Sequence, residues 1–204
     1  MVTSMAVAHP DSPSHLGRRQ WLAEEVLSWA GLDVCVLRIA AVFFENIATV
    51  HARSIREENI IRNSFGMAQV PWISGRDAAY LVVAALLKPE RFEGEQVHYP
   101  VGVQLMDHTQ IARIIGEHLG REIRYVPVNA QEWADELTAL ASSDPVGPVN
   151  MDMARHIAAV GAALASGKGP IRQPDPDELA RLIGVEPLTF EDYLISETMS
   201  KRLV

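Results

Sequence analysis

Few residues of the 204-residue chain are spaced so that they could perform catalysis by themselves. The seven histidines never form the His-Glu-x-x-His pattern of a zinc hydrolase, and a single cysteine cannot build a sulfur-ligated zinc site. The sequence also has no Gly-x-Ser-x-Gly elbow, which would present a hydrolase nucleophile. We therefore expect neither a metal centre nor a hydrolytic serine.

Two polar side chains interrupt apolar segments and are the best candidates for a functional role. Ser4 follows Val2 and Thr3 in a short strand-like segment, where a serine either satisfies a turn or presents its hydroxyl to a ligand. Arg38 lies within the apolar run 34–40, and a buried charge without a partner is costly. We expect Arg38 to pair with a carboxylate or to contact a ligand.

Three further ionisable residues lie at the beginnings of predicted helices. Asp77 follows Ser74 by three residues, a position where a carboxylate favours the helix dipole, so we interpret it as a helix-start residue and not as an acid. His15 and His108 flank helix starts and are expected at the surface. Neither histidine is predicted to act as a catalytic base.

The first segments of the chain alternate between strand and helix. Apolar residues recur at helical spacing over residues 18–30, and Gly31 can end that helix in a left-handed conformation. The run 34–40 is apolar on both faces, which is typical of a parallel strand covered by helices on both sides. Because a helix separates it from residues 2–4, we predict that these two segments pair in parallel, in a right-handed βαβ unit.

The rest of the chain predicts mostly helices joined by loops. Ser74 is expected to cap a helix over 77–87, and Asp107 with Gln110 forms a capping box for a helix that ends at Gly120. The other expected elements are a strand within 121–128, helices over 131–141 and 151–165, an exposed linker at 167–178 and two short terminal helices.

Composition and charge are those of a soluble globular protein and exclude several classes of partner. The chain is 48% hydrophobic and carries a net charge of −8, so it has no basic surplus for nucleic acid or anionic membrane. No apolar segment approaches the length of a membrane span, and no leader-like segment begins the chain. Cys35 is interpreted as a core thiol, which fits a reducing cytoplasm as the expected location.

Five short patterns follow one another from residue 2 to residue 194. They are Val2-Thr3-Ser4 with the helix at 15–24, the passage 30–38 with Phe43-Phe44-Glu45-Asn46, the element 72–79, the segments 106–112 and 119–121, and the closing segment 184–194. In this order they resemble the NmrA-like family of atypical short-chain dehydrogenases/reductases. The common order, more than any one match, makes the resemblance specific.

Two motifs of such dehydrogenases have no counterpart in this sequence. No Tyr-x-x-x-Lys pair is present, and Arg18, Arg19 and Gln20 stand nearest to the position where the family usually has a lysine. The first four strands of the family, which carry G-x-x-G-x-x-G, are also unmatched. Three strand–helix units need about 90 residues. The resemblance therefore implies that the chain corresponds to the C-terminal two-thirds of such a protein.

The fold that the resemblance implies is α/β. We expect a partial Rossmann domain, a doubly wound parallel sheet that lacks its first strands, followed by a small and mainly helical substrate domain. The Rossmann part is placed at residues 1–88, with a strand-like segment at 67–73, and the substrate part at residues 89–204.

The resemblance also implies the residues of the site. In the family a small hydroxyl residue at the position of Ser4 faces the nicotinamide of NAD(P), whereas the glycine-rich loop holds the pyrophosphate. Only the nicotinamide side is therefore expected here. Expected cofactor contacts are Thr3, Ser4, Arg19, Gln20, Ile39, Ala40 and Phe43, and expected substrate contacts are Phe44, Trp72 and Trp133.

The implied activity is that of an NAD(P)-dependent oxidoreductase that transfers a hydride to a small quinone-like, azo or carbonyl compound. The alternative is a regulatory protein that senses NAD(P) without turnover. A third interpretation is a truncated product that is inactive by itself. Since the pyrophosphate loop is missing from the sequence, we expect this chain alone to bind NAD(P) weakly and to self-associate through an exposed sheet edge.

Overall fold

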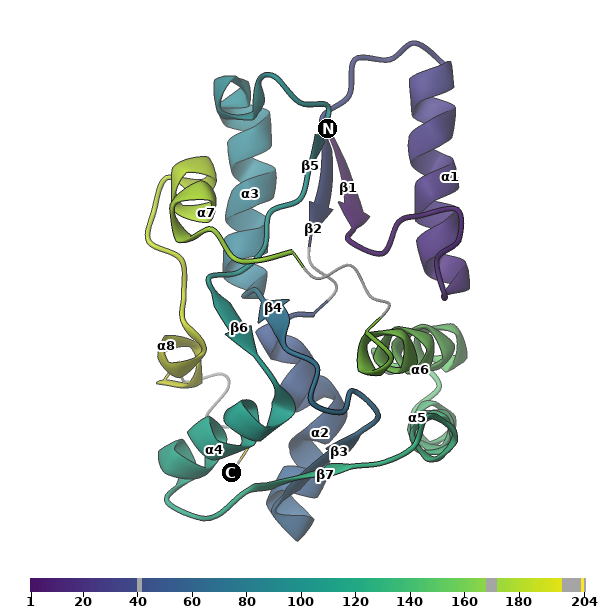
Figure 1. The fold of residues 1–204 in the computed structure, drawn as a ribbon, viewed down its shortest axis with the longest axis vertical. Coiled ribbons are helices and arrows are strands. Elements are labelled where there is room, and N and C mark those ends of the chain that lie inside the picture. The colour runs from purple at the N-terminus through teal and green to yellow at the C-terminus, as the bar shows by residue number, and fades with distance from the viewer. Residues whose placement is uncertain (40–41, 168–171, 196–202, 204) are drawn as a thin grey trace. The chain divides into compact units, whose positions relative to one another are not determined.

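The structure, a computed structural model, begins with short strands separated by helices and ends with a run of helices from α5 (Ala130–Ser143) to α8 (Phe190–Ile195) (Figure 1). It describes residues 1–39, 42–167, 172–195 and 203. Ala40, one of the expected cofactor contacts, lies outside the described residues. The strands are β1 (Val2–Met5), β2 (Val36–Ile39), β3 (Ile60–Asn63), β4 (Val70–Trp72), β5 (Val97–His98), β6 (Gln104–Met106) and β7 (Arg124–Pro127).

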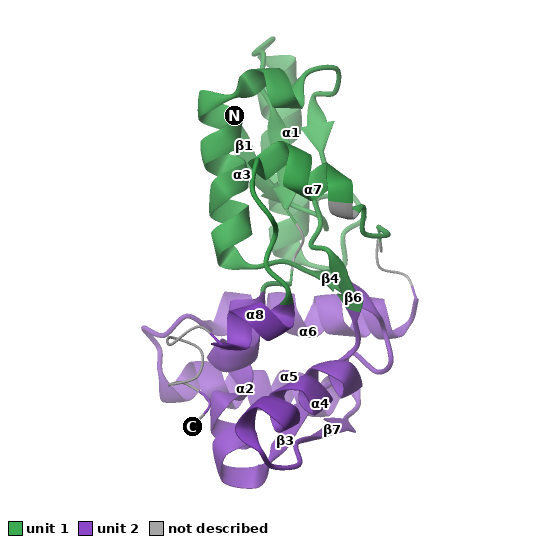
Figure 2. Ribbon diagram, turned by 90° about the vertical axis from the view of Figure 1, so that its left-hand side faces the viewer, with its two compact units in different colours: residues 1–43, 71–105, 170–189 green, residues 44–70, 106–169, 190–204 purple. Residues whose placement is uncertain are grey.

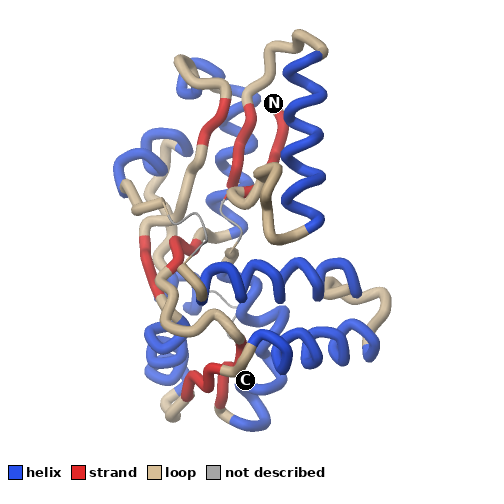
Figure 3. Tube along the Cα trace, turned by 45° about the vertical axis from the view of Figure 1, so that its right-hand side comes forward, coloured by secondary structure: helices blue, strands red, loops and turns tan. Residues whose placement is uncertain are grey.

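The helices account for most of the remaining chain (Figure 3). They are α1 (His15–Trp29), α2 (Phe44–Glu58), α3 (Gly75–Leu87), the 3-10 helix η1 (Pro89–Phe92), α4 (His108–Leu119), α5 (Ala130–Ser143), α6 (Met151–Ala165), α7 (Pro176–Ile183) and α8 (Phe190–Ile195). The long helix α2 and the strand β3 were not among the predicted elements, because Phe43-Phe44-Glu45-Asn46 was interpreted only as a turn.

The chain forms two compact units, which are coloured separately in Figure 2. Unit 1 comprises residues 1–43, 71–105 and 170–189, and unit 2 comprises residues 44–70, 106–169 and 190–204. Each unit is assembled from three separate stretches of sequence. The predicted domain division after residue 88 stays a prediction.

Unit 1 contains the parallel sheet predicted from the sequence. Its strand order is β1-β2-β5, and β1 pairs with β2 in parallel, with Val2 opposite Val36 and Ser4 opposite Arg38. The prediction of a βαβ unit is therefore confirmed, since α1 connects the two strands. Together with the second parallel pair in unit 2, this confirms the α/β fold class.

The two faces of the unit 1 sheet are used differently. Leu37 and Ile39 of β2 point into an apolar core with Leu81 of α3 and Leu179 of α7. Because side chains alternate along a strand, Arg38 points to the opposite face, where α1 lies. One face of the sheet is thus an apolar core, and the other carries the polar groups of β1 and β2.

Unit 2 is built around the parallel pair β3-β7, in which Ile61 lies opposite Tyr125. Helices α5 and α6 pack together on an apolar cluster that includes Trp133, Leu137 and Ala154. The predicted capping box is present at the start of α4, where the Asp107 side chain accepts from the backbone N–H of Gln110. The local helix signals of the sequence are therefore reproduced in both units.

Candidate functional site

The polar face of the unit 1 sheet brings together one residue from β1, one from β2 and one from α1. Ser4 and Arg38 are directly opposite each other in the parallel register, so their side chains share a face. Glu24 is buried on the side of α1 that faces this sheet, with only 7% of its surface exposed. A hydroxyl, a guanidinium and a carboxylate therefore meet in a nearly closed environment.

The Glu24 carboxylate is the centre of this group. Arg38 donates from Nε to both carboxylate oxygens, at 3.0 Å to Oε1 and 2.9 Å to Oε2, and its Nη2 also donates to Oε2. The hydroxyl of Ser4 donates to Oε1 of the same carboxylate. Arg38 thus forms a buried ion pair, which is the first of the two roles expected for it.

Tyr99 completes the surroundings of Arg38. The Nη1 of Arg38 donates to the Tyr99 hydroxyl, and its guanidinium carbon lies 5.2 Å from the centroid of the Tyr99 ring. The hydrogen bonds to Glu24 are the largest cause that raises the pKa of Arg38, and burial acts in the opposite direction. The guanidinium therefore stays charged and holds Glu24 in one orientation.

This arrangement limits what the Ser4 hydroxyl can do. A hydroxyl has one proton to donate, and Ser4 gives it to Glu24, so towards a ligand it can only accept a hydrogen bond. The carboxylate that receives it is already engaged by the guanidinium of Arg38. Ser4 is consequently suited to orienting a ligand N–H group and unsuited to nucleophilic attack.

The other expected cofactor residues of β1 and α1 differ in placement. Gln20 is half-buried one helical turn before Glu24, so it lies on the same face of α1. Thr3 is exposed on β1. Arg19 is exposed and lies about 140° around α1 from Glu24. The structure therefore places Gln20 on the side of α1 that carries Glu24 and directs Arg19 to the outer side of the helix.

Three further predicted site residues belong to the apolar part of unit 1. Ile39 is the last residue of β2 and is buried in the core with α3. Phe43 packs partly buried against that core and forms an isolated parallel bridge with Ile73. Trp72 is buried in β4, with 2% of its surface exposed.

The remaining two predicted substrate residues lie in unit 2, in two aromatic groups. Phe44 begins α2, is 1% exposed and contacts the rings of Phe190 and Tyr193 at centroid distances of 5.2 and 5.3 Å. Trp133 of α5 is 3% exposed and stacks on His51 at 5.4 Å. The predicted pocket, which would draw on both units, stays a prediction.

A buried histidine pair in unit 2 corrects one expectation. His108 was expected at the surface, but it is only 2% exposed and stacks on Tyr125 at 5.4 Å. Its ring centroid is 6.4 Å from that of His51. Burial lowers the pKa of each histidine to about 3. At His51, electrostatic repulsion by His108 lowers the pKa further. Both are therefore neutral near pH 7 and cannot serve there as cationic acids.

Glu24 and Tyr99 are the members of the polar group that the sequence did not identify. The signal for Glu24 was present, because a charged residue in an apolar strand needs a carboxylate and Glu24 lies opposite the apolar positions of its helix. No local signal indicated Tyr99, which lies 61 residues after Arg38 and approaches it only through the fold.

No described helix is both long and apolar enough to cross a membrane. Within the same residues, no group of three or more histidine, cysteine, aspartate or glutamate side chains is arranged to hold a metal ion.

No family model matches this chain. Two known proteins are similar in sequence over part of their length. The chain is 31% identical over 134 residues to the NAD(P)H azoreductase of Xenophilus azovorans, a match that covers 65% of this chain and 45% of the relative. It is 30% identical over 110 residues to the agroclavine dehydrogenase of Claviceps fusiformis, which covers 52% of this chain and 37% of the relative. The matches thus span less than half of these relatives.

Solved structures share the fold over nearly the whole chain. An NADPH-dependent quinone oxidoreductase from Escherichia coli, in complex with NADPH, is similar with a TM-score of 0.75 at 19% identity over 94% of this chain and 62% of that one. The triphenylmethane reductase of Citrobacter sp., in complex with NADP(H), has a TM-score of 0.74 at 20% identity over 98% of this chain and 64% of that one. This chain spans less than two thirds of either structure.

Proposed function

We propose that this chain, which has the NmrA-like, atypical short-chain dehydrogenase fold, forms the nicotinamide side of an NAD(P)-dependent oxidoreductase. The observation that carries the proposal is the fixed hydroxyl of Ser4 on the polar face of the parallel sheet. In open α/β sheets, ligands bind beyond the carboxyl ends of the strands, and Ser4 is the penultimate residue of β1.

The residues present fit one end of the cofactor. The carboxamide of nicotinamide has an N–H₂ group, and the Ser4 hydroxyl is left with acceptor capacity only, so the two are complementary. Gln20 is half-buried one turn before Glu24 on the same side of α1, and we propose that it contacts the same ring or its ribose. The sequence holds no glycine-rich loop for the pyrophosphate, so the fit concerns the nicotinamide end alone.

Within this proposal each residue has a limited task. NAD(P)H, when bound, supplies the hydride. Glu24 and Arg38 act as positioning residues, because they hold the Ser4 hydroxyl in one rotamer. Thr3 within β1, Ile39 at the end of β2 and Phe43 beyond that end remain proposed cofactor contacts. Arg19 points to the outer side of α1 and is left out of the proposed cofactor site.

The proposed acceptor is a small quinone-like, azo or carbonyl compound. The name of the azoreductase relative and the names of the similar quinone oxidoreductase and triphenylmethane reductase support this class. Trp72, Phe44 and Trp133 are proposed to shape the substrate side, although each is nearly buried in its own unit.

The nicotinamide end of the cofactor can be tested separately from the rest. We expect saturation-transfer NMR to detect contact between the chain and reduced nicotinamide mononucleotide, which lacks the adenosine half. Ser4→Ala should weaken this signal several-fold. Ser28→Ala, an exposed serine on the same helix as Glu24, should leave it unchanged.

A second measurement separates an enzyme from a sensor. Oxidation of NADPH is followed with a benzoquinone, an azo dye or an aldehyde present, and turnover with any of them supports the oxidoreductase. Binding without oxidation of the cofactor would favour the NAD(P)-sensing alternative. A signal for the mononucleotide that does not depend on Ser4 would contradict the proposed site.

A further inference from the structure

Three buried polar atoms of unit 2 have no hydrogen-bond partner among the residues that the structure describes. They are Nδ2 of Asn63, Oγ of Ser64 and Nε1 of Trp133, and these residues are only 0%, 5% and 3% exposed. Most buried donors in folded proteins are paired, because a buried donor without a hydrogen-bond acceptor is unfavourable. Three in one unit therefore indicate a site that a ligand completes. We call Asn63, Ser64 and Trp133 the donor group.

The contacts of Asn63 fix the orientation of its side-chain amide. Its Oδ1 accepts hydrogen bonds from the backbone N–H of Phe65 and from the Tyr125 hydroxyl, each at 3.0 Å. A backbone N–H can only donate, so the atom that it contacts is the amide oxygen. The amide N–H₂ of Asn63 is therefore the group that remains to be satisfied. The indole N–H of Trp133 is also a donor only, and the Ser64 hydroxyl can donate as well.

A series of ring contacts connects the members of the donor group. Trp133 stacks on His51 at 5.4 Å, and the His51 ring lies 6.4 Å from that of His108. His108 in turn contacts the rings of Phe65 at 4.9 Å and of Tyr125 at 5.4 Å. The Tyr125 hydroxyl then bonds to the donor group itself. The unpaired donors thus share one neighbourhood of aromatic and imidazole rings inside unit 2.

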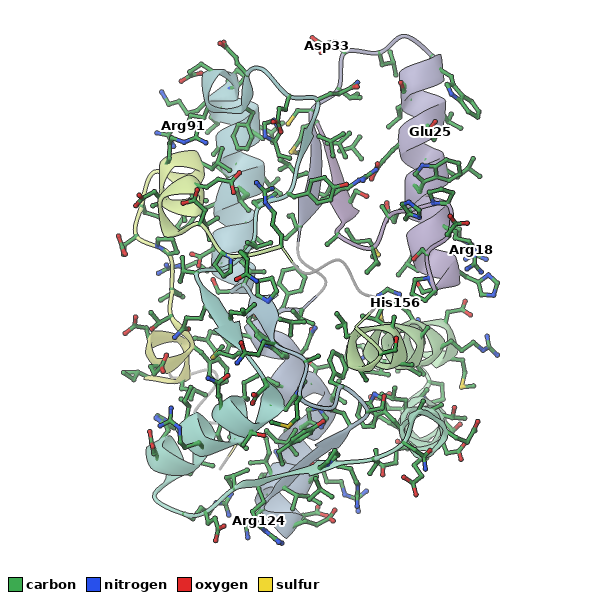
Figure 4. All side chains as sticks on the ribbon, in the orientation of Figure 1. Arg18, Glu25, Asp33, Arg91, Arg124 and His156 are labelled. Carbon is green, nitrogen blue, oxygen red and sulfur yellow. The ribbon has the colours of Figure 1, made fainter. Side chains whose placement is uncertain are left out.

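The donor group includes the carboxyl end of a parallel strand. Asn63 is the last residue of β3 and lies opposite Pro127 of β7, whereas Arg124, labelled in Figure 4, begins β7 at the other end of the pair. The Ser64 hydroxyl faces α6, where a Cβ atom on Gly161 would lie 3.0 Å from it. Ligands of parallel sheets bind beyond the carboxyl ends of the strands. The location therefore favours a ligand as well.

The charges around the donor group favour a neutral ligand. His51 and His108 are uncharged near pH 7, because burial lowers the pKa of each to about 3. Tyr125 is uncharged too, since burial raises its pKa to about 12. The Asp107 carboxylate contributes to that increase, so a negative charge lies close by. An anion would be repelled there, whereas a neutral oxygen can accept hydrogen bonds without needing a counter-charge.

We propose that the donor group binds the oxygen atom of a small, neutral, aromatic carbonyl compound. That oxygen has two lone pairs, and the donor group offers it an indole N–H, an amide N–H₂ and a hydroxyl. The neighbouring rings supply flat apolar contacts for the rest of the ligand.

That this compound is also the hydride acceptor rests on the function proposed above. Among the acceptors considered there, quinone-like and carbonyl compounds carry such an oxygen, whereas an azo group does not. The donor group therefore selects the first two classes over the third.

The indole N–H of Trp133 gives a direct readout in the isotope-labelled full chain, and its NMR resonance is identified by its loss in Trp133→Phe. We expect acetophenone to shift this resonance in a saturable way, with a dissociation constant of about 0.1 to 10 mM. Ethylbenzene, which lacks the carbonyl oxygen, should bind at least about tenfold more weakly. Benzoate, which carries a negative charge, should leave the resonance in place.

Two serine variants of unit 2 test the site itself. Ser64→Ala removes one donor with little change in volume and should weaken acetophenone binding about three- to tenfold. Ser142→Ala, which changes an exposed serine on α5, is the matched control and should bind as the original chain does. Circular dichroism confirms that each variant is folded.

These titrations contain no cofactor, so their result is separate from the oxidation of NADPH that tests the proposed function. A Trp133 resonance that acetophenone does not shift, equal binding of ethylbenzene, or an unchanged affinity in Ser64→Ala would each overturn the proposal.

Discussion

The Ser4 hydroxyl donates a hydrogen bond to the carboxylate of Glu24, 20 residues further along the chain. The same carboxylate forms an ion pair with Arg38. Three groups that would each be unfavourable alone are thereby satisfied together on one face of a parallel sheet. The side chains of Arg38 and Glu24 are only 15% and 6% exposed, so the pair is largely removed from solvent screening. This relationship leads to the first prediction.

Glu24→Ala should destabilise the protein strongly, because it leaves the guanidinium of Arg38 buried without a counter-charge. Breaking such a pair from one side typically costs about 3–5 kcal/mol of unfolding free energy. Urea denaturation followed by circular dichroism measures the change. Glu25→Ala, on the neighbouring and more exposed position, should stay within about 0.5 kcal/mol of the original chain. Equal losses for both variants would mean that the ion pair is unimportant.

The buried histidines predict a loss of stability in acid. His51 and His108 have pKa values lowered to about 3 in the folded chain, compared with about 6.5 when unfolded, so the unfolded state binds more protons between these values. Their contribution is present above pH 6.5 and is lost as the pH falls towards 3. The unfolding free energy should decrease there by up to about 2.7 kcal/mol per pH unit for the two groups.

The corresponding measurement is urea denaturation at several pH values between 3 and 7. Replacing both buried histidines, as in His51→Phe/His108→Phe, should flatten the dependence if the double variant folds. His9→Gln, which changes an exposed histidine, serves as the control and should preserve the slope. A slope that remains in the double variant would assign the acid sensitivity to other groups.

Gly102 should not tolerate a side chain. A Cβ atom at this position would lie 1.5 Å from the carbonyl oxygen of Trp72, so the backbone of one segment would have to move. We expect Gly102→Ala to lower the unfolding free energy by about 1–3 kcal/mol, the usual range for overpacking. Gly31→Ala is a useful contrast, because that site is open and only its φ of +67° opposes a side chain, which should cost about 1–2 kcal/mol.

Asp77 should matter for the structure of unit 1. Its side chain is 1% exposed, and it accepts one hydrogen bond from the N–H of Leu188, at 2.9 Å, and others from Arg76. Asp77→Ala leaves the Leu188 N–H without this acceptor, and we expect a loss of about 1–3 kcal/mol. Asp33→Ala, an exposed acidic residue of unit 1 outside its helices and strands, is the matched control. Unchanged thermal stability in Asp77→Ala would disprove the structural role.

Structural features that depend on residues close together in the sequence were predicted correctly. The cap at Ser74, the capping box at Asp107, the left-handed Gly120 and the boundaries of α6 all involve residues within a few positions of one another. The parallel pairing of β1 with β2 was also predictable, because an intervening helix leaves few ways to connect two apolar segments. The resemblance to one family then gave the fold class.

Which side chains of an element are buried and which are exposed was decided by the tertiary structure. The apolar positions of α1 predicted the helix correctly, yet they lie outside and Glu24 lies inside, because buried Arg38 requires a carboxylate. His108 follows a helix cap, a place that is usually solvated, yet it is buried among Phe65, Tyr125 and His51. Caps and periodicity are local properties of a sequence, whereas burial and charge pairing depend on residues brought together from 14 to 61 positions apart.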